Sequence, residues 1–242
     1  MEDISKKEFS SIKRPKKLSY QIEEQILNSI RQKVFAVGDL LPGENKLTDI
    51  FKVSRGVIRE ALQMLATKGM IEIQKGKGAI VLNPSIDTIL DPFSSFIDFK
   101  CGNKGLSCSL EARIKIEPQV AALAAMNRTK DDLLKLGEFY KNMKKYKGDL
   151  EKLHFFDIEF HKSISTASAN PLFAIILEPI YHFQQTYYKD VLDYIDQDNE
   201  TFDYHLKILN AIEQKDSESA AQYMEKHLSV ALEYIEKSLI YK

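Results

Sequence analysis

Three histidines and one aspartate occupy positions where helical spacing would turn their side chains toward an apolar interior. Asp157 and His161 are one helical turn apart, so they point to the same side of their helix. His205 and His227 each line up with apolar residues three and four positions away in two later segments. A divalent metal bound by all four removes the cost of burying them unpaired. We therefore expect a metal site, with zinc first and nickel or manganese as alternatives. A hydrogen-bonded network without metal is the competing interpretation.

The other two histidines have weaker patterns. His154 lies seven residues before His161, where it could compete as a ligand or support the site from outside the ligand shell. His182 shows no partner in the sequence and is expected to be an ordinary helix residue.

A second group of residues suits a polyanion. Arg55 and Arg59 are four positions apart at the start of a predicted helix that Ser54 would cap, and they face away from its apolar stripe. Paired guanidinium groups grip phosphates or bridge guanine O6 and N7. Gly56 between them would let the backbone come close to DNA. The alternative is an ordinary solvated helix face on which Glu60 pairs with a neighbour.

The elements around these arginines follow the order helix, short helix, helix, hairpin. Apolar spacing predicts a helix over Leu18–Val34, a short one near Asn45–Phe51 and a third from Ser54 to Lys68. Two β-capable runs, Met70–Gln74 and Ala79–Leu82, then flank a glycine-containing turn. This order is typical of a winged helix-turn-helix, whose recognition helix enters the major groove.

Charge is distributed unevenly along the chain. Residues 1–82 contain 15 Lys/Arg and 10 Asp/Glu, whereas residues 83–242 contain 19 and 25. Lys75 and Lys77, on the predicted turn, would meet the adjacent minor groove as part of a wing. A basic N-terminal third indicates a polyanion-binding part, with chance clustering of surface lysines as the alternative.

From Asn83 onward strand signals vanish, and helical periodicity predicts an all-α bundle of six or seven helices. Two helices are expected at about Phe202–Gln214 and Ser217–Leu239, and Asn170-Pro171 and Glu178-Pro179 are expected to interrupt earlier ones. The fold class is therefore mainly α. The expected divisions are a flexible arm over residues 1–15, the winged helix over 16–82, a linker over 83–90 and the bundle over 91–240.

Composition sets the broad class of the protein. With 242 residues, 44% of them hydrophobic and 29% charged, the chain can bury a sizeable core and is not a disordered segment. No apolar run approaches the ~18 residues of a membrane helix, and Met1–Lys17 lacks the apolar part of a signal peptide. Cys101 and Cys108 fit neither a disulfide scaffold nor a zinc knuckle. We expect a cytoplasmic protein without membrane association.

The N-terminal motifs resemble the DNA-binding domain of GntR-family bacterial transcription regulators. The matching segments are Gly38–Glu44, Val53–Leu62 and Gly69–Glu72. The resemblance implies DNA contacts by Arg55 and Arg59 of the recognition helix and by Gly76 of the wing. Where the family usually has a further DNA-contacting arginine, this chain has Asn45, followed by Lys46. Either Lys46 substitutes for that arginine or the operator preference differs.

The remainder resembles the effector-binding domain of the FadR subfamily of GntR regulators, known as the FCD fold. The matching segments include Glu111–Arg113, Ile116–Pro118, Asp157–His161, Ala167–Pro171, His205–Ile212 and His227-Leu228. The resemblance implies that the metal ligands are Asp157, His161, His205 and His227. The residue before the third ligand, usually Glu in the family, is Tyr204, which affects the surroundings of the ligands rather than the ligand set.

The same resemblance implies a role for Arg113. Members of the family often use this arginine to hold a carboxylate of the effector. Its place on the face of Leu110 and Glu117 points it inward, and an open metal position could chelate a hydroxy or keto acid whose carboxylate pairs with the guanidinium. An Arg113–Glu117 salt bridge is the alternative, and both can hold at once.

These features predict a metabolite-responsive bacterial transcription regulator, acting as a repressor, that binds a palindromic operator as a homodimer. A small carboxylate bound at the metal site would control its affinity for double-stranded DNA. One alternative is a metalloenzyme whose metal activates water, but we find no inward general base and no phosphate-binding glycine loop. The other is a regulator that senses an acyl-CoA or another effector without metal.

Overall fold

The computed structural model describes residues 17–83, 85–187 and 199–240, with the side chains of 199–201 and 238–240 left aside. The expected arm over residues 1–15 lies outside this range. The chain divides into two compact units, residues 1–88 and 89–242. The boundary falls inside the segment expected as a linker, whose last residues already belong to helix α4, which begins at Asp87.

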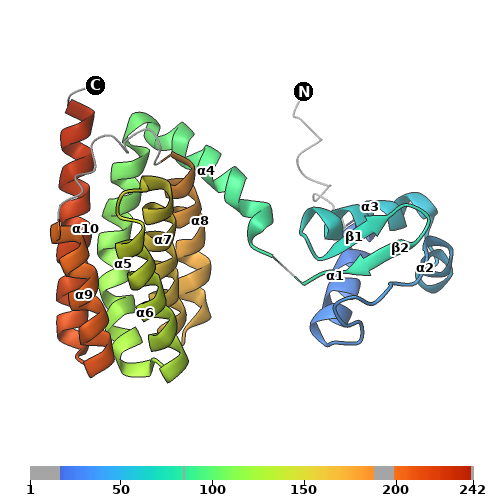
Figure 1. The fold of residues 1–242 in the computed structure, drawn as a ribbon. Helices are drawn as coiled ribbons and strands as arrows, with labels where there is room; N and C mark the ends of the chain where they lie inside the picture. Colours follow the sequence, from blue (N-terminus) through green and yellow to red (C-terminus); the bar gives the residue numbers. More distant parts are fainter. Residues whose placement is uncertain (1–16, 84, 188–198, 241–242) are drawn as a thin grey trace, which may run out of the picture. The chain divides into compact units, whose positions relative to one another are not determined.

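The N-terminal unit is a winged helix-turn-helix, as predicted (Figure 1). Its helices are α1 (Leu18–Arg31), α2 (Glu44–Phe51) and α3 (Arg55–Thr67), and its strands are β1 (Ile71–Gln74) and β2 (Gly78–Val81). The two strands pair antiparallel, and Gly76 at the tip of the hairpin has a positive φ of 79°, a conformation that favours glycine.

One apolar core holds this unit together. Ile22 and Ile26 of α1, Ile58 and Leu65 of α3 and Ile71 of β1 are all buried in it. The spacing of four positions in α1 and of seven positions in α3 explains why these two segments form amphipathic helices. Helix α1 ends at Arg31, three residues earlier than expected.

In the described part of the C-terminal unit, seven α-helices follow. They are α4 (Asp87–Cys101), α5 (Gly105–Asn127), α6 (Lys130–Lys145), α7 (Leu150–Ala167), α8 (Pro171–Tyr187), α9 (Asn199–Gln214) and α10 (Ser217–Ile240). Helix α5 is central, because it packs against α7, α8, α9 and α10 (Figure 1). None of the described helices is long and apolar enough to cross a membrane.

Short polar motifs fix where two of these helices begin. Asp149 caps α7 by accepting a hydrogen bond from the Lys152 backbone N–H at 3.1 Å. Asp216 does the same for α10 through the Ser219 N–H at 3.0 Å. Such side chains satisfy N–H groups that a helix leaves unpaired at its start. These two caps stabilise the first turns of α7 and α10, which carry site residues.

The two expected proline interruptions have different outcomes. Pro171 begins α8, the position where a helix tolerates proline best. The prediction for Pro179 was wrong, because α8 continues through it to Tyr187. Pro179 and the neighbouring Ile180 and Phe183 are buried, and packing of this apolar face offsets the roughly 3 kcal/mol that an interior proline costs.

Candidate metal and effector site

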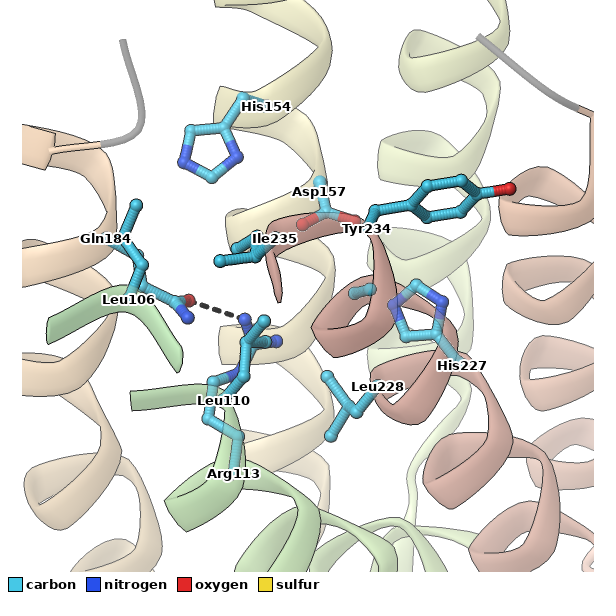
Figure 2. A pocket seen from close by; sticks show the side chains of 11 residues that line it. Leu106, Leu110, Arg113, His154, Asp157, Gln184, His227, Leu228, Tyr234 and Ile235 are labelled. Atoms are coloured by element: carbon cyan, nitrogen blue, oxygen red, sulfur yellow. Dashed lines mark hydrogen bonds between the residues drawn. The ribbon is translucent and has the colours of Figure 1, made fainter. Parts of the chain in front are cut away.

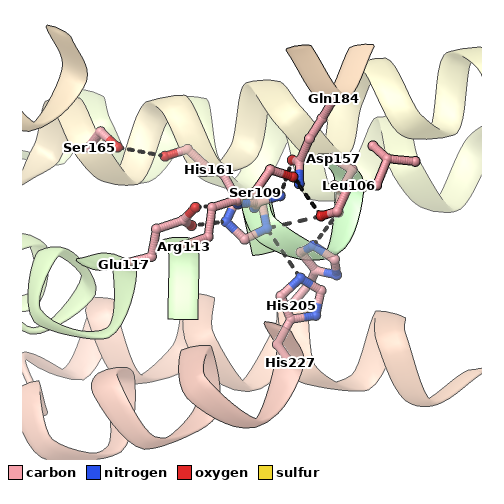
Figure 3. A network of polar contacts seen from close by, with 10 residues as sticks. All are labelled: Leu106, Ser109, Arg113, Glu117, Asp157, His161, Ser165, Gln184, His205 and His227. Atoms are coloured by element: carbon pink, nitrogen blue, oxygen red, sulfur yellow. Dashed lines mark hydrogen bonds and ion pairs between the residues drawn. The ribbon is translucent and has the colours of Figure 1, made fainter. Parts of the chain in front are cut away.

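The four predicted metal ligands come together inside the bundle. Helix α7 supplies Asp157 and His161, α9 supplies His205 and α10 supplies His227 (Figure 3). One potential ligand atom from each lies within 4.8 Å of the other three. The three histidines are buried, with at most 4% of each exposed. Helical spacing thus predicted the inward orientation correctly.

The spacing of these atoms fits a small cation. His205 Nε2 is 2.8 Å from Asp157 Oδ1, His161 Nε2 is 4.0 Å from the same oxygen, and the Nε2 atoms of His161 and His227 are 3.2 Å apart. Donor atoms about 2.0–2.2 Å from a tetrahedral zinc ion lie roughly 3.3–3.6 Å from one another. The observed distances bracket that range, so small side-chain shifts would close the four donors around a divalent ion.

The protonation states also suit metal binding. Burial lowers the pKa of His161, and burial together with the other imidazoles lowers the pKa of His227 well below the usual value. Burial would raise the pKa of Asp157, but the hydrogen bond with His205 and the nearby imidazoles outweigh it and hold that pKa well below its ordinary range. Neutral imidazoles and an ionised carboxylate are the forms that ligate metals.

Arg113 is buried on α5 and held by two partners. Its Nε donates to Glu117 Oε1 and its Nη1 donates to Gln184 Oε1, both at 2.5 Å. The guanidinium carbon lies 5.1 Å from the centre of the Tyr181 ring. Burial would raise the pKa of Glu117, but Arg113 and His161 overcome this effect and lower it to about 2. The predicted salt bridge between Arg113 and Glu117 is therefore present.

A cavity of about 80 Å³ joins the guanidinium to the ligand cluster (Figure 2). Its polar lining comes from Arg113, His154, Asp157, Gln184 and His227. Its apolar lining comes from Leu106, Leu110, Leu228, Ala231, Tyr234 and Ile235. Among the described residues, Arg113 Nη2 is buried without a hydrogen-bond partner. A donor left unpaired beside a cavity is a binding group for an anion.

The two remaining histidines differ in position. His154 lines the cavity, outside the four-residue cluster, and burial lowers its pKa to about 4. His182 lies apart from the site, and its Nε2 is 3.0 Å from Asp91 Oδ1, so it connects α8 with α4. This hydrogen bond crosses 91 positions of sequence, and no local pattern signals it.

Sequence reasoning missed two contacts of the site. Glu117 Oε2 lies 2.5 Å from His161 Nδ1, so the carboxylate reaches the ligand cluster as well as Arg113. Gln184 was not foreseen, and its Nε2 donates to Ser109 Oγ at 2.9 Å. The shared face of Arg113 and Glu117 was the available signal for the first contact. For Gln184 the signal was its place one helical turn after Ile180, on the buried face of α8.

The predicted DNA-contact residues all lie on the surface of the winged helix. They are Asn45, Lys46, Ser54, Arg55, Gly56, Arg59, Lys75, Gly76 and Lys77. Arg59 Nε donates to Glu44 Oε2 at 2.9 Å, although its side chain stays 67% exposed. The Glu60 carboxylate, for which a neighbouring partner was expected, lies 3.8 Å from Lys17 Nζ.

A winged helix-turn-helix followed by a helical unit with a polar ligand cavity defines the class of ligand-responsive transcription regulators. Two family models match the chain. "Bacterial regulatory proteins, gntR family" covers residues 18–81, and "FCD domain" covers residues 108–230. The chain therefore belongs to the GntR family of bacterial regulatory proteins and carries an FCD domain. Its family members are transcription regulators rather than enzymes, which removes the metalloenzyme alternative.

Individual relatives agree with this assignment. The HTH-type transcriptional repressor NanR of Cronobacter sakazakii is 30% identical over 217 residues, which are 88% of this chain and 84% of that protein. NanR of Salmonella newport matches with the same identity and coverage. Among solved structures, Streptococcus agalactiae GntR superimposes with a TM-score of 0.72 at 25% identity, over 89% of this chain and 99% of that one.

Proposed function

We propose that the protein is a cytoplasmic, metabolite-responsive transcription repressor of the FadR subfamily. It binds a palindromic operator as a homodimer, and a small carboxylate bound beside a divalent metal controls its affinity for DNA. Zinc is the expected metal, with nickel and manganese as alternatives. Regulators that resemble the chain over most of its length are named as repressors, which supports the direction of control.

The observation that carries the effector proposal is the shared cavity. Arg113 and two of the candidate ligands, Asp157 and His227, line the same space, and Arg113 Nη2 is a buried donor without a hydrogen-bond partner. A carboxylate oxygen of the effector would pair with the guanidinium while a neighbouring hydroxyl or keto oxygen reaches the metal. The metal when bound supplies Lewis acidity and an open coordination position. The protein residues orient the acid and exclude water from it.

The size and lining of the cavity favour a small acid over an acyl-CoA. A space of about 80 Å³ has room for several water molecules or one compact ligand. An acyl-CoA would need a far larger pocket together with contacts for its nucleotide. The clustering of four residues that suit a divalent metal also argues against a sensor that works without metal.

For DNA binding, the exposed arginines of α3 and the lysines of the wing support contact with two adjacent grooves. Arg55 and Arg59 would reach the major groove, and Lys75, Gly76 and Lys77 would lie at the minor groove. A two-fold homodimer presents two such units to two half-sites. The effector would act by population shift, binding best to an arrangement in which the two recognition helices no longer fit the operator.

The first test is a thermal-shift series on protein loaded with Zn²⁺ and on protein stripped with a chelator. The probes are lactate, pyruvate, citrate and gluconate, with propionate as a carboxylate that lacks an adjacent oxygen. A true ligand raises the melting temperature by mass action. We expect at least one hydroxy or keto acid to stabilise only the loaded protein and to release operator DNA in fluorescence anisotropy. A metal-dependent effector would be contradicted if the acids raised the melting temperature of loaded and stripped protein equally. It would also be contradicted if propionate were the only probe that raised it.

A further inference from the structure

Glu117 belongs to a buried network of polar contacts, in which it bridges Arg113 and His161 (Figure 3). One carboxylate oxygen, Oε1, accepts the hydrogen bond from Arg113 Nε at 2.5 Å. The other, Oε2, lies 2.5 Å from His161 Nδ1. All three side chains are at most 4% exposed, so water does not compete for these positions. Glu117 therefore touches both the candidate effector-binding cation and a candidate metal ligand.

The chemistry of the donors determines which nitrogen of His161 carries the proton. A guanidinium N–H can only donate, and an ionised carboxylate can only accept. At Oε2, His161 Nδ1 must therefore carry a hydrogen and donate it. A neutral imidazole has one N–H, so Nε2 keeps its lone pair. That atom faces the cluster, 3.2 Å from His227 Nε2 and 4.0 Å from Asp157 Oδ1.

We propose that Glu117 is a positioning residue that holds His161 as the Nδ1–H tautomer, so that Nε2 is available to a metal, while it fixes Arg113 beside the same cavity. The proposal rests on the metal site of the proposed function and adds the residue that joins it to the effector-binding arginine. A carboxylate behind a ligating imidazole orients the ring and strengthens the ligand. Here the same carboxylate also accepts a hydrogen bond from Arg113 Nε, so one side chain orients both the candidate metal ligand and the candidate effector-binding arginine.

Replacement of Glu117 by glutamine removes the carboxylate charge and is expected to change the His161 tautomer, while the size of the side chain stays nearly the same. Glutamine has nearly the same size but only one acceptor oxygen, and its amide nitrogen can only donate. Arg113 Nε has no acceptor capacity, so the amide oxygen must turn to Arg113. The amide NH₂ then faces His161 Nδ1, which must accept, and the imidazole proton moves to Nε2. In that position the proton blocks the metal.

The experiment compares wild type, E117Q and the control E111Q, whose residue is exposed on the same helix. Zn²⁺ affinity is measured by competition with a chromophoric chelator. The tautomer is read from ¹⁵N-histidine NMR of stripped protein, with His161 assigned by the loss of its signals in H161N. We expect E117Q to bind Zn²⁺ about 10–100-fold more weakly and to carry the His161 proton on Nε2. E111Q should match wild type in both measurements.

The outcomes distinguish a failure of the metal site from a failure of the role of Glu117. If wild type binds no Zn²⁺, the metal site of the proposed function fails. If wild type binds Zn²⁺ but E117Q binds it equally well, or keeps the Nδ1–H tautomer, the role of Glu117 is overturned. Should E117Q not fold, the stripped wild-type protein still decides, because an Nε2–H tautomer of His161 there contradicts the proposal.

Discussion

Arg59 already has a carboxylate partner in the free protein, since its Nε donates to Glu44 at the start of α2. The pair is exposed, so it contributes little to stability. Its effect is to direct the rest of the guanidinium, whose remaining N–H groups can still meet DNA. At the residue scale, the winged helix thus presents a pre-oriented arginine next to the exposed Arg55.

Replacing Arg55 with alanine should weaken operator binding by about 1–3 kcal/mol. It should also make the slope of the logarithm of the binding constant against the logarithm of salt concentration shallower by about one. The reason is that its guanidinium is expected to contact either a phosphate or a guanine edge. The measurement is fluorescence anisotropy at several salt concentrations, on an operator selected from a random-sequence duplex pool. Lys130→Ala, on the surface of the other unit, serves as the control. An Arg55→Ala affinity equal to that of the control would refute the assignment.

Individual residues show both the reach and the limit of sequence reasoning. Spacing placed His161, His205 and His227 inward because helical periodicity depends only on local geometry. It did not reveal the contact between Glu117 and His161, which lie 44 positions apart on two helices. Periodicity states which side of a helix is buried, but the rotation and height of the neighbouring helix decide which atoms meet.

At the scale of elements, a close approach between α5 and α8 explains one glycine. A Cβ built on Gly105 would lie 2.6 Å from Phe183 Cζ, inside normal contact distance. Phe183 is buried and cannot swing away, and the next residue along α8 is Gln184, which holds Arg113. The small residue therefore lets α8 come near enough to form the clamp on the arginine.

Gly105→Ala should lower the free energy of unfolding by about 1–3 kcal/mol, because the added methyl group overpacks a filled interior. Gly137→Ala in α6 is the matched control, since within the described structure nothing lies within 4 Å of the built Cβ. That change should instead stabilise the protein by about 0.4–1 kcal/mol through the lower chain entropy of alanine. Urea unfolding measures both values. The same sign for the two variants would show that the α5–α8 contact has been misjudged.

The elements themselves were largely predictable, and the errors have physical causes. The helices of the winged unit begin where expected, since their apolar stripes and turn residues are local signals. Pro179 misled the prediction because the cost of an interior proline is local, whereas the packing that offsets it is tertiary. The end of α1 was predicted three residues too late for a different reason. Helix ends depend on weak local preferences, and α1 ends at Arg31.

At the scale of the whole molecule, α4 carries a row of exposed phenylalanines in the described structure. Phe93, Phe96 and Phe99 follow one another at helical spacing, and their exposed fractions are 37%, 58% and 82%. Sequence periodicity cannot distinguish such a face from a core face, because it does not show whether the same chain covers it. Exposed apolar surface of this kind is typical of protein interfaces. It supports the homodimer of the proposed function.

Phe99→Ser should convert the protein from a dimer to a monomer, or raise its dimer dissociation constant at least tenfold, because it removes apolar area from the expected interface. Analytical ultracentrifugation over a range of concentrations measures this change. Leu134→Ser is the control, since Leu134 is 72% exposed on α6. The interface on α4 is wrong if Phe99→Ser dimerises as wild type does, or if both variants dissociate equally.

Chelator-stripped protein should lose stability as the pH falls below 6.5. Burial lowers the pKa of His161 and His227, and it lowers that of His154 to about 4. Below pH 6.5 the unfolded chain therefore binds protons that the folded protein does not, so stability is complete above that pH and declines toward pH 4. Melting temperatures between pH 7.5 and 5.0 measure the slope. His154→Gln should show a shallower decline, and an unchanged slope would contradict the buried neutral state of His154.

Enclosure of the ligand cluster by α7, α9 and α10 also determines how quickly the protein can respond to its surroundings. Three of the four candidate ligands are at most 4% exposed, whereas Asp157 is 23% exposed and lines the cavity. An ion bound among them would therefore leave slowly, by local opening of the helices or through that cavity. Its rate of release would then be set by the protein and not by the concentration of metal outside. On the proposed function, each molecule would largely keep the metal that was available when it folded. A change in metal supply reaches the population only at the pace of opening or of new synthesis.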